Sequence, residues 1–84
     1  AAASGDDAIL DLIAGLGGKD NIMSVENCFT RLRVNVADES KVNEDLINHM
    51  KNSGIVRKGN DIQVIFGMEV ASVRGKVEEA LANM

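Results

Sequence analysis

The stretch Cys28-Phe29-Thr30-Arg31-Leu32-Arg33-Val34-Asn35-Val36 decides how this chain folds. From Thr30 onward, apolar and polar side chains alternate, which is the pattern of a β-strand with one buried face. Leu32 and the two valines should therefore point into the core, while Arg31 and Arg33 should lie together on the opposite face. Because one cysteine stands at the start of this strand, the same stretch also carries the most reactive side chain of the protein.

A second strand is predicted just before this one. Residues 21–27 include Ile22, Met23 and Val25, and so form a short apolar run of the kind that pairs with a neighbouring strand. Only Asn27 and Cys28 separate the two strands. We therefore expect a tight hairpin with the cysteine in or beside its turn.

Three helices are predicted from apolar residues that recur every three or four positions. The first follows a capping Asp6 or Asp7 and ends at Gly17-Gly18, where glycine supplies the positive φ of a helix terminus. The second begins at the polar break 38–40, where Asp38 should cap it, and ends at Gly54. The apolar stripes are Ile9, Leu12, Ile13 and Leu16; Val42, Leu46, Ile47 and Met50; and Val70, Val73, Val77 and Leu81.

Two more strands, at residues 55–56 and 62–66, flank a turn at 58–61 and complete the order α-β-β-α-β-β-α. This order predicts an α+β fold, a two-layer sandwich in which three helices cover one face of a four-stranded, mainly antiparallel sheet. The arginines would then lie on the uncovered face. Such a face can receive a partner protein or a phosphoryl group.

Composition limits the class of protein. The chain has 84 residues, enough for one small domain, and its 45% apolar and 26% charged residues are typical of a soluble protein. No apolar run in these residues is long enough to span a bilayer, and no pattern typical of a secretory signal appears among them. The net charge of −4 argues against nucleic-acid binding. Residues 1–5 resemble a linker or a cloning remnant, which leaves residues 6–84 as the domain.

The cysteine count points in the same direction. A single cysteine cannot form an internal disulfide, which fits a reducing, cytoplasmic compartment. One cysteine and one histidine cannot close a zinc site, so we expect neither a metal nor a cofactor. Nearby positive charge favours the nucleophilic thiolate of Cys28, and the guanidinium groups of Arg31 and Arg33 can hold phosphoryl oxygens. The Thr30 hydroxyl and free N–H groups of the turn could assist.

Each of these residue types also has other common roles. A lone cysteine is often a small buried hydrophobe, and alternate arginines are often a solvated face. A phosphatase or arsenate reductase needs five residues between cysteine and arginine, whereas four separate Cys28 from Arg33 and two separate it from Arg31. The segment after the cysteine also favours a strand and not a phosphate loop. His49 stands within a helix with no motif around it, which favours a surface histidine over a phosphorylated one.

The run Cys28 to Arg33, followed by Asp38, resembles the cysteine motif of the glucose-type enzyme IIB domains of the bacterial phosphoenolpyruvate-dependent sugar phosphotransferase system. Further likeness lies in Gly17-Gly18, in Val25 to Cys28 and in Gln63 to Gly67, and in all it covers roughly residues 6–83. Met68 departs from the family, where many relatives have proline. The family fold agrees with the element order predicted above.

The resemblance implies that Cys28 accepts a phosphoryl group from a phosphohistidine on a IIA partner. The cysteine would then pass the group to a sugar bound in the membrane-embedded IIC domain, which couples uptake to phosphorylation. Arg31 and Arg33 match the family's arginine pair, tied mainly to the transfer to sugar. The chain would work at the cytoplasmic side of the cell membrane and itself be soluble. A non-catalytic module that binds a regulator protein through the open sheet face stays possible at this point.

Overall fold

The computed structural model describes residues 4–84. Along them the elements are α1 (Ser4–Gly15), β1 (Ile22–Asn27), β2 (Arg31–Val36), α2 (Glu44–Ile47), β3 (Gly54–Lys58), β4 (Asp61–Ile65) and α3 (Val70–Ala82), with single 3-10 turns at Lys19–Asn21 and Glu39–Lys41. The predicted order of helices and strands is confirmed. Residues 1–3 of the predicted linker lie outside the described residues, and Ser4 and Gly5 are the first residues of α1, ahead of the predicted capping position.

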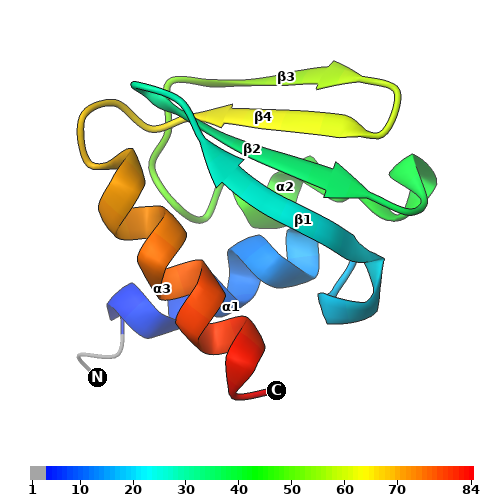
Figure 1. Ribbon diagram of the computed structural model, residues 1–84, viewed down its shortest axis with the longest axis horizontal. Helices are drawn as coiled ribbons and strands as arrows, with labels where there is room; N and C mark the ends of the chain where they lie inside the picture. The colour runs from blue at the N-terminus through cyan, green and yellow to red at the C-terminus, as the bar shows by residue number, and fades with distance from the viewer. Residues whose placement is uncertain (1–3) are drawn as a thin grey trace.

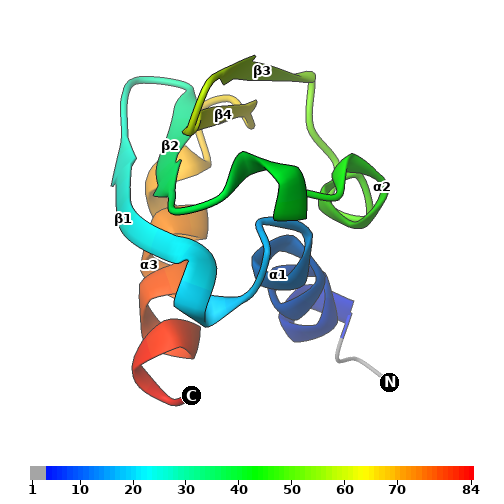
Figure 2. The same cartoon turned by 90° about the vertical axis from the view of Figure 1, so that its right-hand side faces the viewer.

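The four strands form one antiparallel sheet in the order β1-β2-β4-β3. The three helices lie on one side of this sheet, with α1 and α3 packed against each other beneath it (Figures 1 and 2). The other side of the sheet carries no helix. The predicted two-layer α+β sandwich is therefore confirmed, and β2 is a central strand with a partner on each side.

The alternation along β2 is reproduced residue by residue. Leu32 and Val34 are 0% exposed and Val36 is 1% exposed, whereas the arginines between them are exposed. Val34 pairs with Val25 of β1 and with a buried isoleucine of β4, so apolar side chains from three strands meet between the sheet and the helices. Burying a side chain of this size contributes roughly 2 kcal/mol. The core therefore fixes the register of β2 and with it the face on which the arginines lie.

The end of α1 is joined to the rest of the fold by close backbone contacts. The carbonyl of Gly15 accepts a 2.6 Å hydrogen bond from the N–H of Asn43, and a Cβ at Gly15 would lie 2.8 Å from Ile47. Gly17 follows with φ of 102°, the positive value predicted for the helix terminus. Glycine is required at both positions, at the first for space and at the second for backbone conformation.

Asn21 is the buried polar side chain of the core. Its Nδ2 donates to the carbonyls of Leu16, at 2.8 Å, and Asp38, at 3.0 Å, and its Oδ1 accepts a 2.9 Å bond from the N–H of Asp38. All three bonds reach backbone groups at the ends of α1 and β2. Asn21 therefore ties the first helix to the exit of the central strand.

The second helix differs from its prediction. The sequence pattern predicts one helix from residues 38–40 to Gly54, but the structure has a 3-10 turn at Glu39–Lys41, an extended Val42 and a short α2. The reason is local: the side chain of Asn43 accepts hydrogen bonds from the N–H groups of Asp45 and Leu46 and so starts a new helix. The apolar stripe is still used, since Ile47 is fully buried.

The second hairpin is longer than its prediction. β3 runs from Gly54 to Lys58 and not only through residues 55–56, and β4 begins at Asp61 and ends at Ile65. Pairing with β4 extends the strand to residues whose side chains are polar, because the ladder of backbone hydrogen bonds does not depend on the side chain. The hairpin forms the edge of the sheet beside β2.

Candidate active site

Cys28 lies in the turn between β1 and β2, as the sequence predicts, and is exposed. Its N–H donates a 2.8 Å hydrogen bond to the carbonyl of Arg31, which closes the hairpin. Within residues 4–84, the N–H groups of Phe29 and Thr30 have no protein acceptor. The thiol is therefore accessible and stands beside two unused backbone donors.

The two arginines share a face but have different partners. Nη1 of Arg33 lies 3.9 Å from Sγ of Cys28, a long contact that places positive charge beside the sulfur. Nη1 of Arg31 instead donates a 3.0 Å hydrogen bond to Oε1 of Gln63, whose Nε2 donates to Asp61 at 2.9 Å. Both guanidinium groups line the same shallow hollow as Cys28. Gln63 also lines it, although the sequence motif did not identify this residue as part of a site.

Thr30 links the turn to the segment that precedes α3. Its carbonyl accepts hydrogen bonds from the N–H groups of Phe66, at 2.8 Å, and Gly67, at 3.0 Å. The side chain lines the hollow, and the hydroxyl makes no hydrogen bond to any described residue. Thr30 is therefore placed to donate to an anion beside Cys28, while its backbone carbonyl holds the turn against the sheet end.

Asn27 and Arg74, which the sequence did not single out, connect the cysteine turn to α3. The side chain of Asn27 donates from Nδ2 to the carbonyl of Cys28 at 3.0 Å. Its Oδ1 accepts a 3.1 Å hydrogen bond from Nη1 of Arg74, on α3. No spacing rule connects residues 27 and 74, because the contact forms only when α3 packs across β1.

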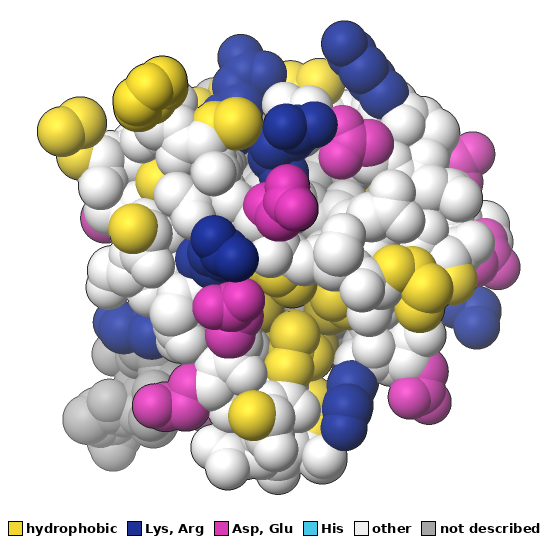
Figure 3. Space-filling view, in the orientation of Figure 1, with side chains coloured by type: hydrophobic (Ala, Val, Ile, Leu, Met, Phe, Trp, Pro, Cys, Tyr) yellow, Lys and Arg dark blue, Asp and Glu magenta, His cyan; other side chains and the backbone are white. Residues whose placement is uncertain are grey.

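Two large apolar side chains, one in the cysteine turn and one in the loop before α3, are almost fully exposed to solvent. Phe29 is 94% exposed and Met68 is 90% exposed. The hydrogen bonds of Thr30 bring their two loops together at one corner of the molecule. In Figure 3, hydrophobic side chains project at the corner where Figure 1 places the β1–β2 turn and the loop before α3. Exposed apolar surface around a reactive group is typical of a protein-docking site.

Asp38 and His49 lie apart from this site. Asp38 caps the 3-10 turn at the far end of β2, where the Ser40 hydroxyl, at 2.6 Å, and the Ser40 N–H, at 2.9 Å, donate to Oδ1. These two hydrogen bonds hold the pKa of Asp38 below its ordinary value. His49 is exposed, and its Nδ1 lies 2.9 Å from a carboxylate oxygen of Asp11 on α1. The prediction that Asp38 caps the second helix is wrong, because Asn43 caps α2 and Asp38 caps the preceding 3-10 turn. The predicted surface position of His49 agrees with the geometry.

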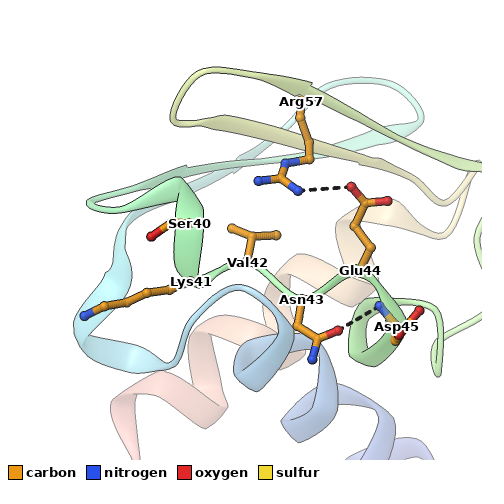
Figure 4. A pocket seen from close by; sticks show the side chains of 7 residues that line it. All are labelled: Ser40, Lys41, Val42, Asn43, Glu44, Asp45 and Arg57. Atoms are coloured by element: carbon orange, nitrogen blue, oxygen red, sulfur yellow. Dashed lines mark hydrogen bonds and ion pairs between the residues drawn. The ribbon is translucent and has the colours of Figure 1, made fainter.

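A larger hollow lies in the segment that follows the far end of β2, and Figure 4 shows the side chains around it. It is lined by Ser40, Lys41, Val42, Asn43, Glu44, Asp45 and Arg57. Its arginine already has two partners, the Glu44 carboxylate at 3.1 Å and the Glu39 carbonyl at 2.9 Å. The Ser40 hydroxyl already donates to Asp38 and the guanidinium is engaged, so this hollow offers neither a free hydroxyl nor a free arginine. The hollow beside Cys28 is therefore the candidate site.

Metal-binding clusters and membrane-spanning helices also bear on the chemistry of this domain. Within the described residues, no group of three or more His, Cys, Asp or Glu side chains could hold a metal ion. In the same part of the chain, no helix has both the length and the apolar character needed to cross a membrane.

Comparison with known proteins gives the class of this domain. A family model described as phosphotransferase system, EIIB, matches residues 11–43, which include the Cys28 turn and β2. The chain also superposes on a crystal structure described as one domain of the PTS system, IIabc component, from Clostridium difficile. The TM-score is 0.73 with 28% sequence identity, and the match covers 100% of this chain and 85% of that one. These matches define a domain of the phosphotransferase system.

Relatives identify the family. The chain is 39% identical over 70 residues to the PTS system N-acetylglucosamine-specific EIIB component of Streptomyces coelicolor. The aligned region covers 83% of this chain and 91% of that protein. It is 48% identical over 82 residues to the PTS system maltose-specific EIICB component of Bacillus subtilis, of which it spans 16%. The chain belongs to the EIIB family of the phosphotransferase system, as the cysteine motif indicated. Several of its relatives are much longer proteins.

Proposed function

We propose that this domain carries a phosphoryl group on Cys28 between a phosphohistidine donor, the IIA protein or domain, and a sugar bound by the membrane-embedded IIC domain. The observation that carries the proposal is the exposed thiol of Cys28 with the Arg33 guanidinium 3.9 Å from its sulfur, in a chain of the EIIB family. The domain would thus be the phosphotransferase component that couples sugar uptake to sugar phosphorylation.

The chemistry needs two in-line displacements. In the first, the Cys28 thiolate attacks phosphorus, an S–P bond forms, the N–P bond breaks and the imidazole leaves with its electron pair. In the second, a sugar hydroxyl oxygen attacks the same phosphorus, the S–P bond breaks and thiolate is regenerated. The hydroxyl proton passes to a base in the acceptor complex. Because the thiol projects from an exposed turn, both partners can approach it in turn.

The residues around the thiol can stabilise the transferred group. Arg33 is nearest to the sulfur, and Arg31 is held in the same hollow by Gln63. The Thr30 hydroxyl and the free N–H groups of Phe29 and Thr30 can donate to the equatorial oxygens. A loose phosphoryl-transfer transition state needs charge stabilisation and positioning more than covalent help. The turn can supply both.

The surface around Cys28 favours protein partners. We call the exposed side chains of Phe29 and Met68 the apolar collar. A small-molecule phosphate donor would not need such an apolar surface. EIICB relatives, such as the alpha-glucoside-specific protein of Klebsiella pneumoniae, are named as combined components, and this chain spans 13% of that one. On this basis the acceptor is a sugar bound in a membrane-embedded IIC domain, and this EIIB domain works at the cytoplasmic side of the cell membrane. We take the sugar to be an α-glucoside such as maltose, after the relatives' names.

A transfer assay tests the proposal. The domain is mixed with IIA that carries labelled phosphohistidine, and label is followed to the domain and then to sugar when IIC is added. We expect transfer with the wild-type domain and none with Cys28→Ser, while Cys28→Ser remains folded by circular dichroism. Equal labelling of both proteins would contradict the proposal.

A regulatory binding module is the second candidate, because the apolar collar alone could dock a regulator protein. The same assay separates the two functions. A pure binding module would take up no label and would lose nothing when Cys28 is replaced by serine. Label on Cys28 that reaches sugar establishes the carrier function.

A further inference from the structure

The side chain of Asn27 connects helix α3 to the backbone of the cysteine turn. Its Nδ2 donates to the carbonyl of Cys28 at 3.0 Å, and its Oδ1 accepts from Nη1 of Arg74 at 3.1 Å. An arginine has donors only, so the oxygen of the amide must face Arg74. The NH₂ group is thereby directed to the Cys28 carbonyl. The arginine thus determines which way the asparagine amide is oriented.

The Cys28 carbonyl belongs to the same peptide group as the N–H of Phe29. The described residues contain no cis peptide bond, and in a trans peptide the C=O and N–H point in opposite directions. Holding the carbonyl oxygen on the Asn27 side therefore turns the Phe29 N–H away from Asn27. That N–H has no acceptor among the described residues.

Among residues 4–84, no group other than the Asn27 side chain makes a hydrogen bond to this peptide group. The Phe29 side chain is 94% exposed and so packs against almost nothing. The other anchors lie in different peptide groups, the Cys28 N–H in Asn27–Cys28 and the Thr30 carbonyl in Thr30–Arg31. Asn27 is the side chain that holds the Cys28–Phe29 peptide itself.

Arg74 is itself anchored. Its Nε is buried and makes no hydrogen bond of good geometry, although the Glu78 carboxylate lies 3.4 Å away as an ion pair one turn along α3. The guanidinium is therefore held between the helix and Asn27. Its position suits a fixed support for the amide.

We propose that Asn27 and Arg74 are positioning residues that aim the Phe29 N–H at the phosphoryl group on Cys28. This inference rests on the proposed function and adds to it a helix-anchored backbone donor for the transferred group. In the Cys28–Phe29 peptide group, the carbonyl already accepts a hydrogen bond from Asn27, and the N–H is unpaired within residues 4–84. Phosphorylation of Cys28 brings acceptor oxygens to that N–H. The N–H can then donate with no reorganisation of the turn.

The test compares three substitutions by NMR of the backbone amides. In the wild type, phosphorylation of Cys28 should move the Phe29 amide proton strongly downfield, the signature of a hydrogen bond to phosphate. Asn27→Ala and Arg74→Met should each reduce that shift by half or more. Asn27→Asp should do the same, because it keeps the contact to Arg74 but cannot donate to the Cys28 carbonyl.

Matched controls come from outside the turn. Asn52→Ala removes another asparagine that donates to a backbone carbonyl, and Arg57→Met removes another paired arginine. Both should leave the Phe29 shift at the wild-type value. For the Asn27 and Arg74 variants, kcat for transfer from phosphorylated IIA should fall about tenfold with KM unchanged. The Phe29 N–H is still present in these variants but no longer points at the phosphoryl group.

The outcomes separate this inference from the proposed function. If wild-type Cys28 never becomes phosphorylated, both are wrong. If it does, and the Phe29 shift and kcat of Asn27→Asp equal those of the wild type, only the positioning role is wrong. Loss of the shift in Asn27→Asp with a melting temperature near the wild-type value establishes the positioning role, since general unfolding would lower both.

Discussion

Replacing Arg33 with methionine should weaken the phosphorylated state of Cys28 by about 2 kcal/mol. Nη1 of Arg33 lies 3.9 Å from the Cys28 sulfur, and a phosphoryl group there would carry roughly −1.5 to −2 charges at neutral pH. Two unit charges about 4 Å apart attract by roughly 1 kcal/mol in water. The dielectric of water applies because both side chains are exposed. The loss corresponds to about thirtyfold in an equilibrium constant.

The assay measures how phosphate distributes between IIA and this domain at equilibrium. Intact-protein mass spectrometry counts the phosphorylated fraction of each protein for the wild type, Arg33→Met and Arg33→Lys. Lysine keeps the charge, so its equilibrium should stay within about threefold of the wild type, while methionine shifts it about thirtyfold toward IIA. Raising the salt concentration should narrow the difference, because exposed charges are screened.

An equilibrium in Arg33→Met equal to that of the wild type at low salt would refute this reasoning. The lysine variant tests a separate point. Arg31→Lys and Arg33→Lys should leave phosphorylation of Cys28 largely intact but impair transfer to sugar, since a point charge does not replace the planar guanidinium fork. Unchanged sugar phosphorylation in a complete system would show that the assigned role of the arginine pair is wrong.

Three further predictions follow from single contacts. Asn21→Leu should lower the free energy of unfolding in urea by about 3 kcal/mol, because three hydrogen bonds of about 1 kcal/mol each are lost; a loss under about 1 kcal/mol contradicts this. Ser40→Ala should raise the pKa of Asp38 toward its ordinary value in an NMR titration, because the hydroxyl bond is lost, and an unchanged pKa contradicts the role of that hydroxyl. In the wild type this cap contributes stability above the ordinary carboxyl pKa, and the contribution is lost as pH falls through the lowered pKa. Phe29→Ser should raise KM for phosphorylated IIA about tenfold with kcat little changed, since an exposed apolar anchor is lost, whereas Leu10→Ser on α1 should change neither; equal KM values for both variants would exclude the apolar docking role.

The alternation along β2 explains why the fold could be predicted from the sequence. A period of two over seven residues admits only one arrangement with Leu32 and Val34 buried, and both are fully buried in the structure. Once that strand is placed, its hairpin partner and the helices that cover its apolar face follow. The second helix could not be predicted in the same way. Its apolar stripe is real, but Asn43 competes for backbone donors and divides it.

Only those residues of the candidate site that lie close together in the sequence could be predicted from it. Cys28, Thr30 and the two arginines lie within six residues, so one motif names them all. Asn27 is their neighbour in sequence, yet its role depends on Arg74, which is 47 residues away. Gln63 reaches Arg31 across paired strands, at a separation of 32 residues. Side chains that position a site through tertiary contacts leave no pattern in the spacing.

The most direct test of the central claim is to locate the phosphoryl group after the wild-type domain has been incubated with phosphorylated IIA. Tandem mass spectrometry of the digested protein identifies the modified residue, and ³¹P NMR of the intact domain distinguishes a thiophosphate from a phosphoramidate. The account predicts one phosphoryl group on the sulfur of Cys28. A phosphoryl group on His49, or none on the domain, would contradict it.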